Sequence, residues 1–247
     1  YSRMSEPCII VALDYSDSQQ ALNLVNRLDK TYCRIKVGKE LFTAAGPQFI
    51  EQLISRGFEV FLDLKFHDIP NTVAQACKVA ANLGVWMINV HASGGKKMLL
   101  AARDALPPGE TKLIAVTVLT SLDQQALNEI GWYRTPIDIA TKLALLASDC
   151  GLDGVVCSAT EAPLIRKSVP QKNFCLVTPG IRPADSTQDD QVRVTTPRIA
   201  ILNGADYLVI GRPITQSADP IATLQKLNQE ITSAYSEKQL AGLKQIT

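Results

Sequence analysis

The sequence has little of what metal sites and secreted folds require. It has two histidines, His67 and His91, and its six cysteines stand singly without any CxxC pair. A His-rich metal site, a zinc site and a disulfide framework are therefore not expected. Isolated cysteines inside apolar stretches are typical of small buried side chains in a reducing compartment. No apolar run is long enough for a membrane span, and we predict a cytoplasmic protein.

An excess of charge of one sign is also missing. The chain has 25 Lys and Arg against 24 Asp and Glu, which gives a net charge of +1. This balance creates no field that would collect nucleic acid or anionic lipid, and no stripe of basic and aromatic residues suggests a nucleic-acid surface. We therefore expect no nucleic-acid partner and no membrane partner, and any anion site must be local.

Short apolar runs alternate regularly with helical patterns along the chain. Eight runs rich in β-branched residues predict strands at 8–14, 33–38, 58–65, 85–92, 112–120, 153–159, 174–180 and 206–212. Between them, spacings such as Val73, Ala76, Ala80 and Leu83 place apolar residues on one helix face. Strands that alternate with helices pair in parallel, and eight such units in about 250 residues favour a closed (β/α)8 barrel, the TIM barrel.

The chain is expected to form a single α/β domain. No linker rich in Pro, Gly or Ser divides it, so the predicted barrel domain covers residues 4–247. Residues 1–3 look like a short cloning remnant ahead of an initiator methionine at Met4. Two long connections, 120–136 and 181–198, are candidates for lids or binding loops, with plain surface elaboration as the alternative.

Polar residues stand where the predicted strands end. In a parallel barrel the catalytic groups come from these carboxyl ends. The residues are Asp14, Lys36, Asp63, Lys65, His91, Thr120, Arg182, Gly211 and Arg212. One polar strand end is commonplace, but a series of this length predicts an active site. We interpret His91 by itself as an interior residue and give His67 no role.

The strongest local signal is the segment DLKFHD at 63–68. Residues two apart on a strand share a face, so Asp63 and Lys65 are expected to point together into the barrel mouth. Asp68 falls in the following turn, before a helix that Pro70 can begin. An isolated Asp and Lys pair could merely order the strand end. With Lys36 at another strand end, two ammoniums and two carboxylates converge, which a stabilising role explains poorly.

A cluster of alternating charges has a definite chemical meaning. Neighbouring carboxylates favour the charged form of a lysine and orient it beside a substrate. A charged lysine is a general acid that can protonate carbon, whereas a Schiff-base enzyme needs a neutral amine. A Schiff-base aldolase that uses Lys65 is therefore a weaker alternative.

A phosphate site is predicted at the end of the last strand. Gly211 lets the backbone approach a ligand closely, and Arg212 can grip a phosphate with its guanidinium. The loops after the seventh and eighth strands are the usual phosphate site of this barrel, and Arg182 and Gln191 could fold over the same group. Taken singly, an arginine after a glycine is usually a solvated loop residue.

Six motifs follow one another along the chain: VALDYSD (11–17), KVGKELF (36–42), DLKFHDIPNTV (63–73), VTVLTS (116–121), TPGIRP (178–183) and VIGRPIT (209–215). In this order they closely resemble the bacterial orotidine 5′-phosphate decarboxylase family, over almost the whole chain. The resemblance implies decarboxylation of orotidine 5′-monophosphate (OMP) to uridine 5′-monophosphate (UMP), the last step of de novo pyrimidine synthesis. It also implies that neither a metal nor an organic cofactor takes part.

The resemblance assigns the catalytic residues. It matches a charged tetrad to Lys36, Asp63, Lys65 and Asp68, with Lys65 as the proton donor to C6 of the pyrimidine. Members of the family are homodimers whose sites lie at the subunit interface. Asp68 and Thr72 would therefore reach the partner subunit's substrate, and Ile69 between them belongs to the same substrate-binding set.

The resemblance also assigns the contacts to the nucleotide. Asp14 would hold the ribose, and Thr120 would read the pyrimidine edge. The phosphate would be bound by Gln191, Arg212 and the amide of Gly211, with Arg182 on the loop that closes over the ligand.

Two further alternatives stay open. A Mg²⁺-dependent 3-keto-L-gulonate 6-phosphate decarboxylase shares the D-x-K-x-x-D motif, but it resembles a pattern with an acidic metal ligand where this sequence has Lys36. The other alternative is a catalytically silent barrel that binds a phosphorylated nucleotide. An intact set of four charged residues argues against it, because a pure binder does not require so costly a cluster.

Overall fold

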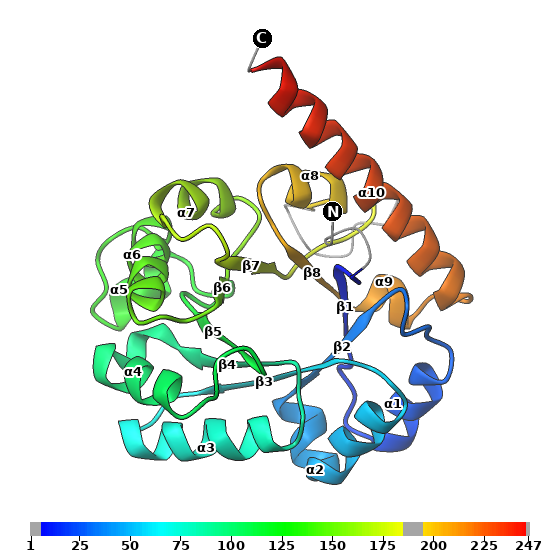
Figure 1. Cartoon of the computed structure of the whole chain (residues 1–247), viewed down its shortest axis with the longest axis horizontal. Helices are drawn as coiled ribbons and strands as arrows, with labels where there is room; N and C mark the ends of the chain where they lie inside the picture. Colours follow the sequence, from blue (N-terminus) through cyan, green and yellow to red (C-terminus); the bar gives the residue numbers. More distant parts are fainter. Residues whose placement is uncertain (1–5, 185–194, 246–247) are drawn as a thin grey trace.

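The computed structural model describes residues 6–184 and 195–245. Its eight strands pair in parallel and in chain order, and the sheet closes between β1 and β8 into a barrel (Figure 1). The strands are β1 Ile9–Ala12, β2 Arg34–Gly38, β3 Val60–Phe66, β4 Met87–His91, β5 Lys112–Val116, β6 Gly154–Val156, β7 Cys175–Thr178 and β8 Tyr207–Ile210. The predicted TIM barrel is confirmed, and each of the eight expected strands is present.

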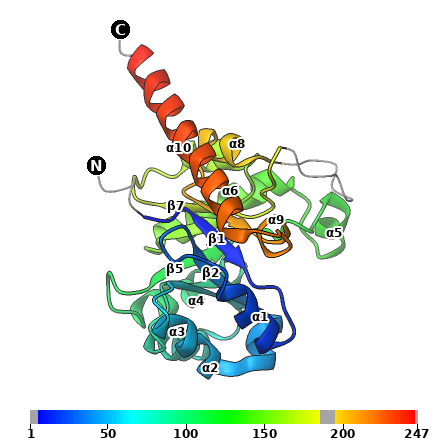
Figure 2. The ribbon, with the colours of Figure 1, turned by 90° about the vertical axis from the view of Figure 1, so that its right-hand side faces the viewer.

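Helices alternate with the strands and surround the barrel (Figures 1 and 2). They are α1 Ser18–Val25, α2 Lys39–Ser55, α3 Pro70–Asn82, the 3-10 helix η1 Ala92–Gly94, α4 Lys96–Asp104, α5 Gln124–Glu129, α6 Pro136–Asp149, α7 Ala162–Ser168, α8 Pro197–Leu202, α9 Arg212–Thr215 and α10 Pro220–Lys244. Helix α3 begins at Pro70 as predicted, because proline at the first helical position loses no intrahelical hydrogen bond.

Each strand is shorter than the run predicted for it; the run 153–159, for example, contains only β6 Gly154–Val156. Strand β5 ends at Val116, where its pairing with β6 stops, so the prediction that it continues to Thr120 is wrong. The long connection 120–136 contains helix α5, whose N-cap Asp123 accepts a hydrogen bond from the amide of Ala126 at 2.8 Å. The N-cap Asp123 starts this helix, although the composition of the segment suggests a loop.

The core has two layers. Inside the barrel, side chains from alternate strand positions form one cluster: Ile10, Phe61, Met87, Ile114, Cys175 and Val177. Between the strands and the helices lies a second, larger layer that includes Val11, Val37 and Ile88. All six cysteines are buried and free, as expected for small apolar side chains. The filled interior supports the strand ends above it.

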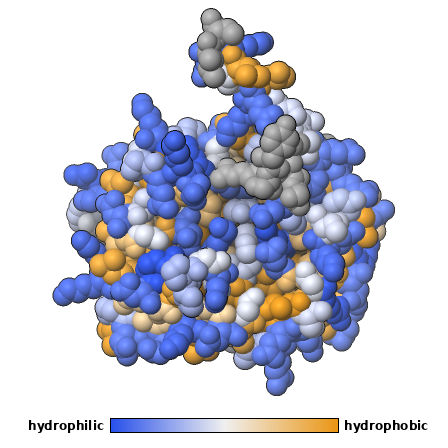
Figure 3. Space-filling model, in the orientation of Figure 1, coloured by the Kyte–Doolittle hydropathy of each residue, from blue (hydrophilic) through white to orange (hydrophobic). Residues whose placement is uncertain are grey.

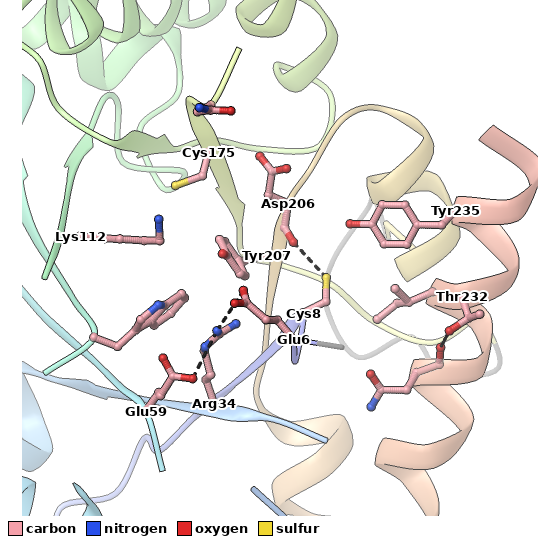
Figure 4. Close-up of a pocket in the computed structure, with 14 residues that line it drawn as sticks. Glu6, Cys8, Arg34, Glu59, Lys112, Cys175, Asp206, Tyr207, Thr232 and Tyr235 are labelled. Carbon is pink, nitrogen blue, oxygen red and sulfur yellow. Dashed lines mark hydrogen bonds and ion pairs between the residues drawn. The ribbon is translucent and has the colours of Figure 1, made fainter. Parts of the chain in front are cut away.

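The amino-terminal end of the barrel is built around Arg34 (Figure 4). Arg34 is 2% exposed, lies 4.1 Å from the ring centroid of Trp86, and pairs with Glu59 at 3.4 Å and Glu6 at 3.6 Å. A cavity of about 500 Å³ lies at this end, among residues at the starts of the strands. Because active sites of this fold lie at the carboxyl ends of the strands, we interpret the Arg34 cluster as stabilising.

Helix α10 packs on α8 and then runs on past the barrel (Figure 2). Its first half buries Leu224, Leu227 and Ile231, whereas its last turns are exposed and include Leu240 and Leu243. Figure 3 shows apolar surface among polar groups on this projecting end. Across residues 6–184 and 195–245, no helix is long and apolar enough to cross a membrane.

Candidate active site

A cavity of about 320 Å³ opens at the carboxyl ends of the strands. Its apolar lining includes Phe61, Val116, Val156, Val177 and Val209. The polar residues that line it are largely the predicted strand-end residues: Asp14, Lys36, Asp63, Lys65, Asn89 and Thr120. A smaller hollow of about 200 Å³ shares four of them with the larger cavity. Polar groups scattered over more than a hundred positions of the sequence thus meet in one place.

Asp63 lies between two lysines. Its Oδ2 is 3.2 Å from Nζ of Lys36, and its Oδ1 is 2.7 Å from Nζ of Lys65. Asp63 is 7% exposed, and the side chains of Lys36 and Lys65 are only 14% and 28% exposed. One carboxylate between two ammoniums leaves one excess positive charge within this three-residue cluster, and Asp14 adds a second carboxylate to the same cavity lining.

The two lysines keep Asp63 ionised. Burial by itself raises the pKa of Asp63. The ammonium of Lys36, then that of Lys65, and hydrogen bonds from Lys65 and Asn89 outweigh burial, so the pKa lies below its ordinary value of 3.8. At neutral pH the carboxylate is therefore charged and holds both ammoniums in place.

Lys65 reaches Asp63 through an irregular backbone. The ladder between β3 and β4 pairs Leu62 with Ile88 and then Phe66 with Val90, so the β3 segment 63–65 faces a single β4 residue. Lys65 has a φ of 51°, and within residues 6–184 and 195–245 it is the one non-glycine residue with positive φ. The prediction that Asp63 and Lys65 meet is confirmed, but a bulge brings them together rather than simple strand alternation. Bulges re-aim side chains next to active sites.

Asn89 on β4 is a site residue that the sequence analysis missed. Its side chain is fully buried, and its Nδ2 donates a hydrogen bond to Oδ1 of Asp63 at 2.8 Å. Its Oδ1 accepts a hydrogen bond from the backbone amide of Lys65 at 2.9 Å. A single amide between the apolar residues Ile88 and Val90 of this strand was the signal that could have found it.

Asp68, Ile69 and Thr72 lie outside this cluster. Strand β3 ends at Phe66, and the exposed Asp68 accepts a hydrogen bond from the amide of Ile69 at 2.6 Å. Ile69 is 67% exposed, and Thr72 is exposed in the first turn of α3. One chain by itself therefore brings together three of the four predicted tetrad residues.

Two of the predicted phosphate residues, Gly211 and Arg212, follow the end of β8, and Arg182 follows β7. Gly211 lines the cavity, where a β-carbon would come within 3.8 Å of Cβ of Ala12. Arg212 follows as the exposed first residue of α9. The backbone amide of Arg182 donates to the carbonyl of Thr195 at 2.9 Å, which ties the two described ends of the long polar loop together. Gln191 lies outside the described residues.

Two histidines pack together beside the cluster. The ring centroids of His67 and His91 are 5.4 Å apart. Burial, then the neighbouring His67 and the ammoniums of Lys39 and Lys65, lower the pKa of His91 against the opposing effect of Asp63. A neutral His91 adds no charge to the site.

The residues at the mouth do not fit a divalent cation. In the part of the chain that the structure describes, no three His, Cys, Asp or Glu side chains converge as metal ligands. The third residue of β2 is Lys36, and its ammonium stands where the Mg²⁺-dependent alternative needs an acidic ligand.

Comparison with known proteins assigns a family. Residues 7–227 match the family model described as orotidine 5′-phosphate decarboxylase / HUMPS family. Orotidine 5′-phosphate decarboxylase of Nitrosospira multiformis is 63% identical over 92% of this chain and 95% of that protein. The enzyme of Nitrosomonas eutropha is 62% identical over 94% of this chain and 100% of that protein.

A solved structure supports the same assignment. Orotidine 5′-phosphate decarboxylase from Lactobacillus acidophilus superposes with a TM-score of 0.82 and 38% identity, over 92% of this chain and 99% of that chain. The strand order, the charged strand ends and these matches agree, and the chain belongs to the orotidine 5′-phosphate decarboxylase / HUMPS family.

Proposed function

We propose that this protein decarboxylates OMP to UMP and CO₂, the last step of de novo pyrimidine synthesis. The observation that carries the proposal is the largely buried cluster of Lys36, Asp63 and Lys65, which lines the cavity together with apolar side chains. The choice of OMP as the substrate rests on the relatives named orotidine 5′-phosphate decarboxylase, which are 62–63% identical over nearly their whole length.

The proposed chemistry needs no metal. The bond between C6 and the carboxylate breaks, CO₂ leaves, and the electron pair stays on C6. The ammonium of Lys65 then donates its proton to C6, and the lysine regains a proton from solvent. Apolar walls reduce screening, so a fixed ammonium stabilises the developing carbanion more than water would. Asp63 orients the ammonium of Lys65 through their 2.7 Å contact, and Lys36 holds Asp63 from the other side.

The nucleotide is proposed to bind across the cavity mouth. Asp14 would hold the ribose and Thr120 the pyrimidine edge, and both line the cavity. The phosphate would bind to the Gly211 amide, Arg212 and Gln191, and the loop that carries Arg182 would close over it. Binding energy from a phosphate far from C6 can then support loop closure and orientation.

We further propose a homodimer in which Asp68, Ile69 and Thr72 complete the neighbouring site. The exposed apolar side chain of Ile69 and the exposed carboxylate of Asp68 support this arrangement. A carboxylate from the partner subunit would offset the excess positive charge of the lysine cluster. Residues 4–247 would act as one catalytic domain, and the six buried free thiols agree with a cytoplasmic location.

The test is the loss of the orotate chromophore on mixing EDTA-treated protein with OMP. Turnover in EDTA supports the metal-free decarboxylase. Turnover of 3-keto-L-gulonate 6-phosphate that depends on Mg²⁺, with none of OMP, would favour the metal-dependent alternative. Tight binding of UMP without turnover at any pH would leave a silent nucleotide-binding barrel.

A further inference from the structure

The side-chain amide of Asn89 contacts both residues on which the proposed chemistry depends most. Its Nδ2 donates to Oδ1 of Asp63, the same oxygen that accepts from Nζ of Lys65. Its Oδ1 accepts from the backbone amide of Lys65. One buried side chain is thus hydrogen-bonded to the carboxylate that orients the lysine and to the backbone that carries it.

The position of Asn89 explains how the bulge persists. Three β3 residues face this one β4 residue, so the regular ladder offers the Lys65 amide no backbone partner there. A buried amide without an acceptor is costly, and the Asn89 side chain supplies that acceptor. The left-handed φ of Lys65 is a sparsely populated conformation that lasts only where its neighbours impose it.

We propose that Asn89 is a positioning residue that sets the orientation of Asp63 and the backbone of Lys65, and thereby the place of the Lys65 ammonium. This inference rests on the proposed decarboxylation. With Oδ1 of Asp63 held by Asn89 and Lys65, its Oδ2 is left for Lys36, so each lysine keeps its own carboxylate oxygen. The chemistry of the position requires one donor, one acceptor and no net charge. Asparagine meets all three conditions. Aspartate would place a second carboxylate against Asp63, and alanine would remove the acceptor of the Lys65 amide and one of the two donors to Oδ1 of Asp63.

The experiment compares Asn89→Ala with a matched control, Thr111→Val. Thr111 is also buried, and its hydroxyl donates to the carbonyl of Val85 at 3.0 Å, at the other end of β4. Both variants lose a buried hydrogen bond, and both are expected to melt at a lower temperature. In Asn89→Ala, kcat for OMP should fall by about 10- to 100-fold, as when a group that orients a site residue is removed. Its KM and its affinity for UMP should change by less than about threefold, because phosphate and ribose contacts dominate them. Thr111→Val should keep the wild-type kcat.

A second variant separates positioning from folding. Asn89→Asp keeps an oxygen for the Lys65 amide but lacks the donor to Asp63 at neutral pH. When the introduced carboxyl group is protonated it can donate again, so the activity of Asn89→Asp relative to wild type should rise as the pH falls. A role limited to stability would leave this ratio independent of pH.

Three results would overturn the inference while leaving the function intact: wild-type kcat in well-folded Asn89→Ala, equal kcat losses in Asn89→Ala and Thr111→Val, or a flat pH ratio for Asn89→Asp. Failure of the proposed function is distinct, because wild type itself would then not consume OMP.

Discussion

Replacing Asp63 with asparagine should destabilise the protein as well as inactivate it. The two contacts, at 3.2 Å and 2.7 Å, are each worth about 5–6 kcal/mol of Coulomb attraction at an effective dielectric constant near 20. Desolvation and repulsion between the lysines offset most of this sum. Breaking a buried ion pair costs about 3–5 kcal/mol, and the partial exposure of Lys36 and Lys65 favours the lower end. We therefore expect Asp63→Asn to lower the free energy of unfolding by about 3 kcal/mol, and Tm by roughly 6–12 °C.

The pH dependence gives this prediction a second signature. Because the pKa of Asp63 is lowered in the folded protein, its stabilisation is present above the unfolded pKa and is lost as the pH falls through the folded value. The difference between wild type and Asp63→Asn should therefore be constant from pH 8 to about pH 5 and narrow in stronger acid.

Urea unfolding at fixed protein concentration measures this difference, and Asp153→Asn is the control. Asp153 pairs with Arg103 at 3.0 Å far from the cavity, so the control should lose about 1 kcal/mol and keep full activity. An Asp63→Asn variant that is as stable as wild type at pH 7 would refute the ion-pair reasoning.

Three further predictions concern the phosphate, the dimer and the histidine. Arg212→Ala should lower kcat/KM for OMP by on the order of 100-fold, because a charged hydrogen bond to the phosphate is lost. The control Arg198→Ala, at another exposed arginine, should keep the wild-type kcat/KM. Equal kcat/KM for the two variants would exclude Arg212 from the phosphate site. Ile69→Asp should shift the protein toward monomer in sedimentation and reduce activity, whereas Leu240→Asp, at an exposed position on α10, should do neither. A monomeric wild type would contradict the shared site. Because the pKa of His91 is lowered on folding, wild type should lose stability as the pH falls below about 6.5, and His91→Gln should lose less; identical pH profiles in urea unfolding would contradict this.

The fold was predictable because most strands and helices show a pattern of apolar residues in the sequence. Apolar runs mark all eight strands, and Pro70 marks the start of α3. The end of β5 was not predictable, because the apolar pattern continues past Val116 although the ladder partner on β6 ends at Val156. Where a strand ends depends on its neighbour, which a pattern within one segment does not contain.

The charged part of the site was predictable and its geometry was not. Lys36, Asp63 and Lys65 stand out as charges in the second halves of the predicted strands, and a parallel barrel brings the carboxyl-terminal parts of its strands together. The left-handed Lys65 and the role of Asn89 depend on the register between β3 and β4. Neither lysine nor asparagine has an intrinsic preference for a β-bulge, so the bulge can be recognised only once the strands are paired in the sheet.

The central claim is that Lys65 protonates C6 in a metal-free site. Turnover of OMP in EDTA by wild type, Lys65→Ala and the exposed Lys97→Ala tests it most directly. The account predicts rapid loss of the orotate absorbance with wild type and Lys97→Ala, and almost none with a well-folded Lys65→Ala. Turnover by Lys65→Ala at the wild-type rate would contradict it.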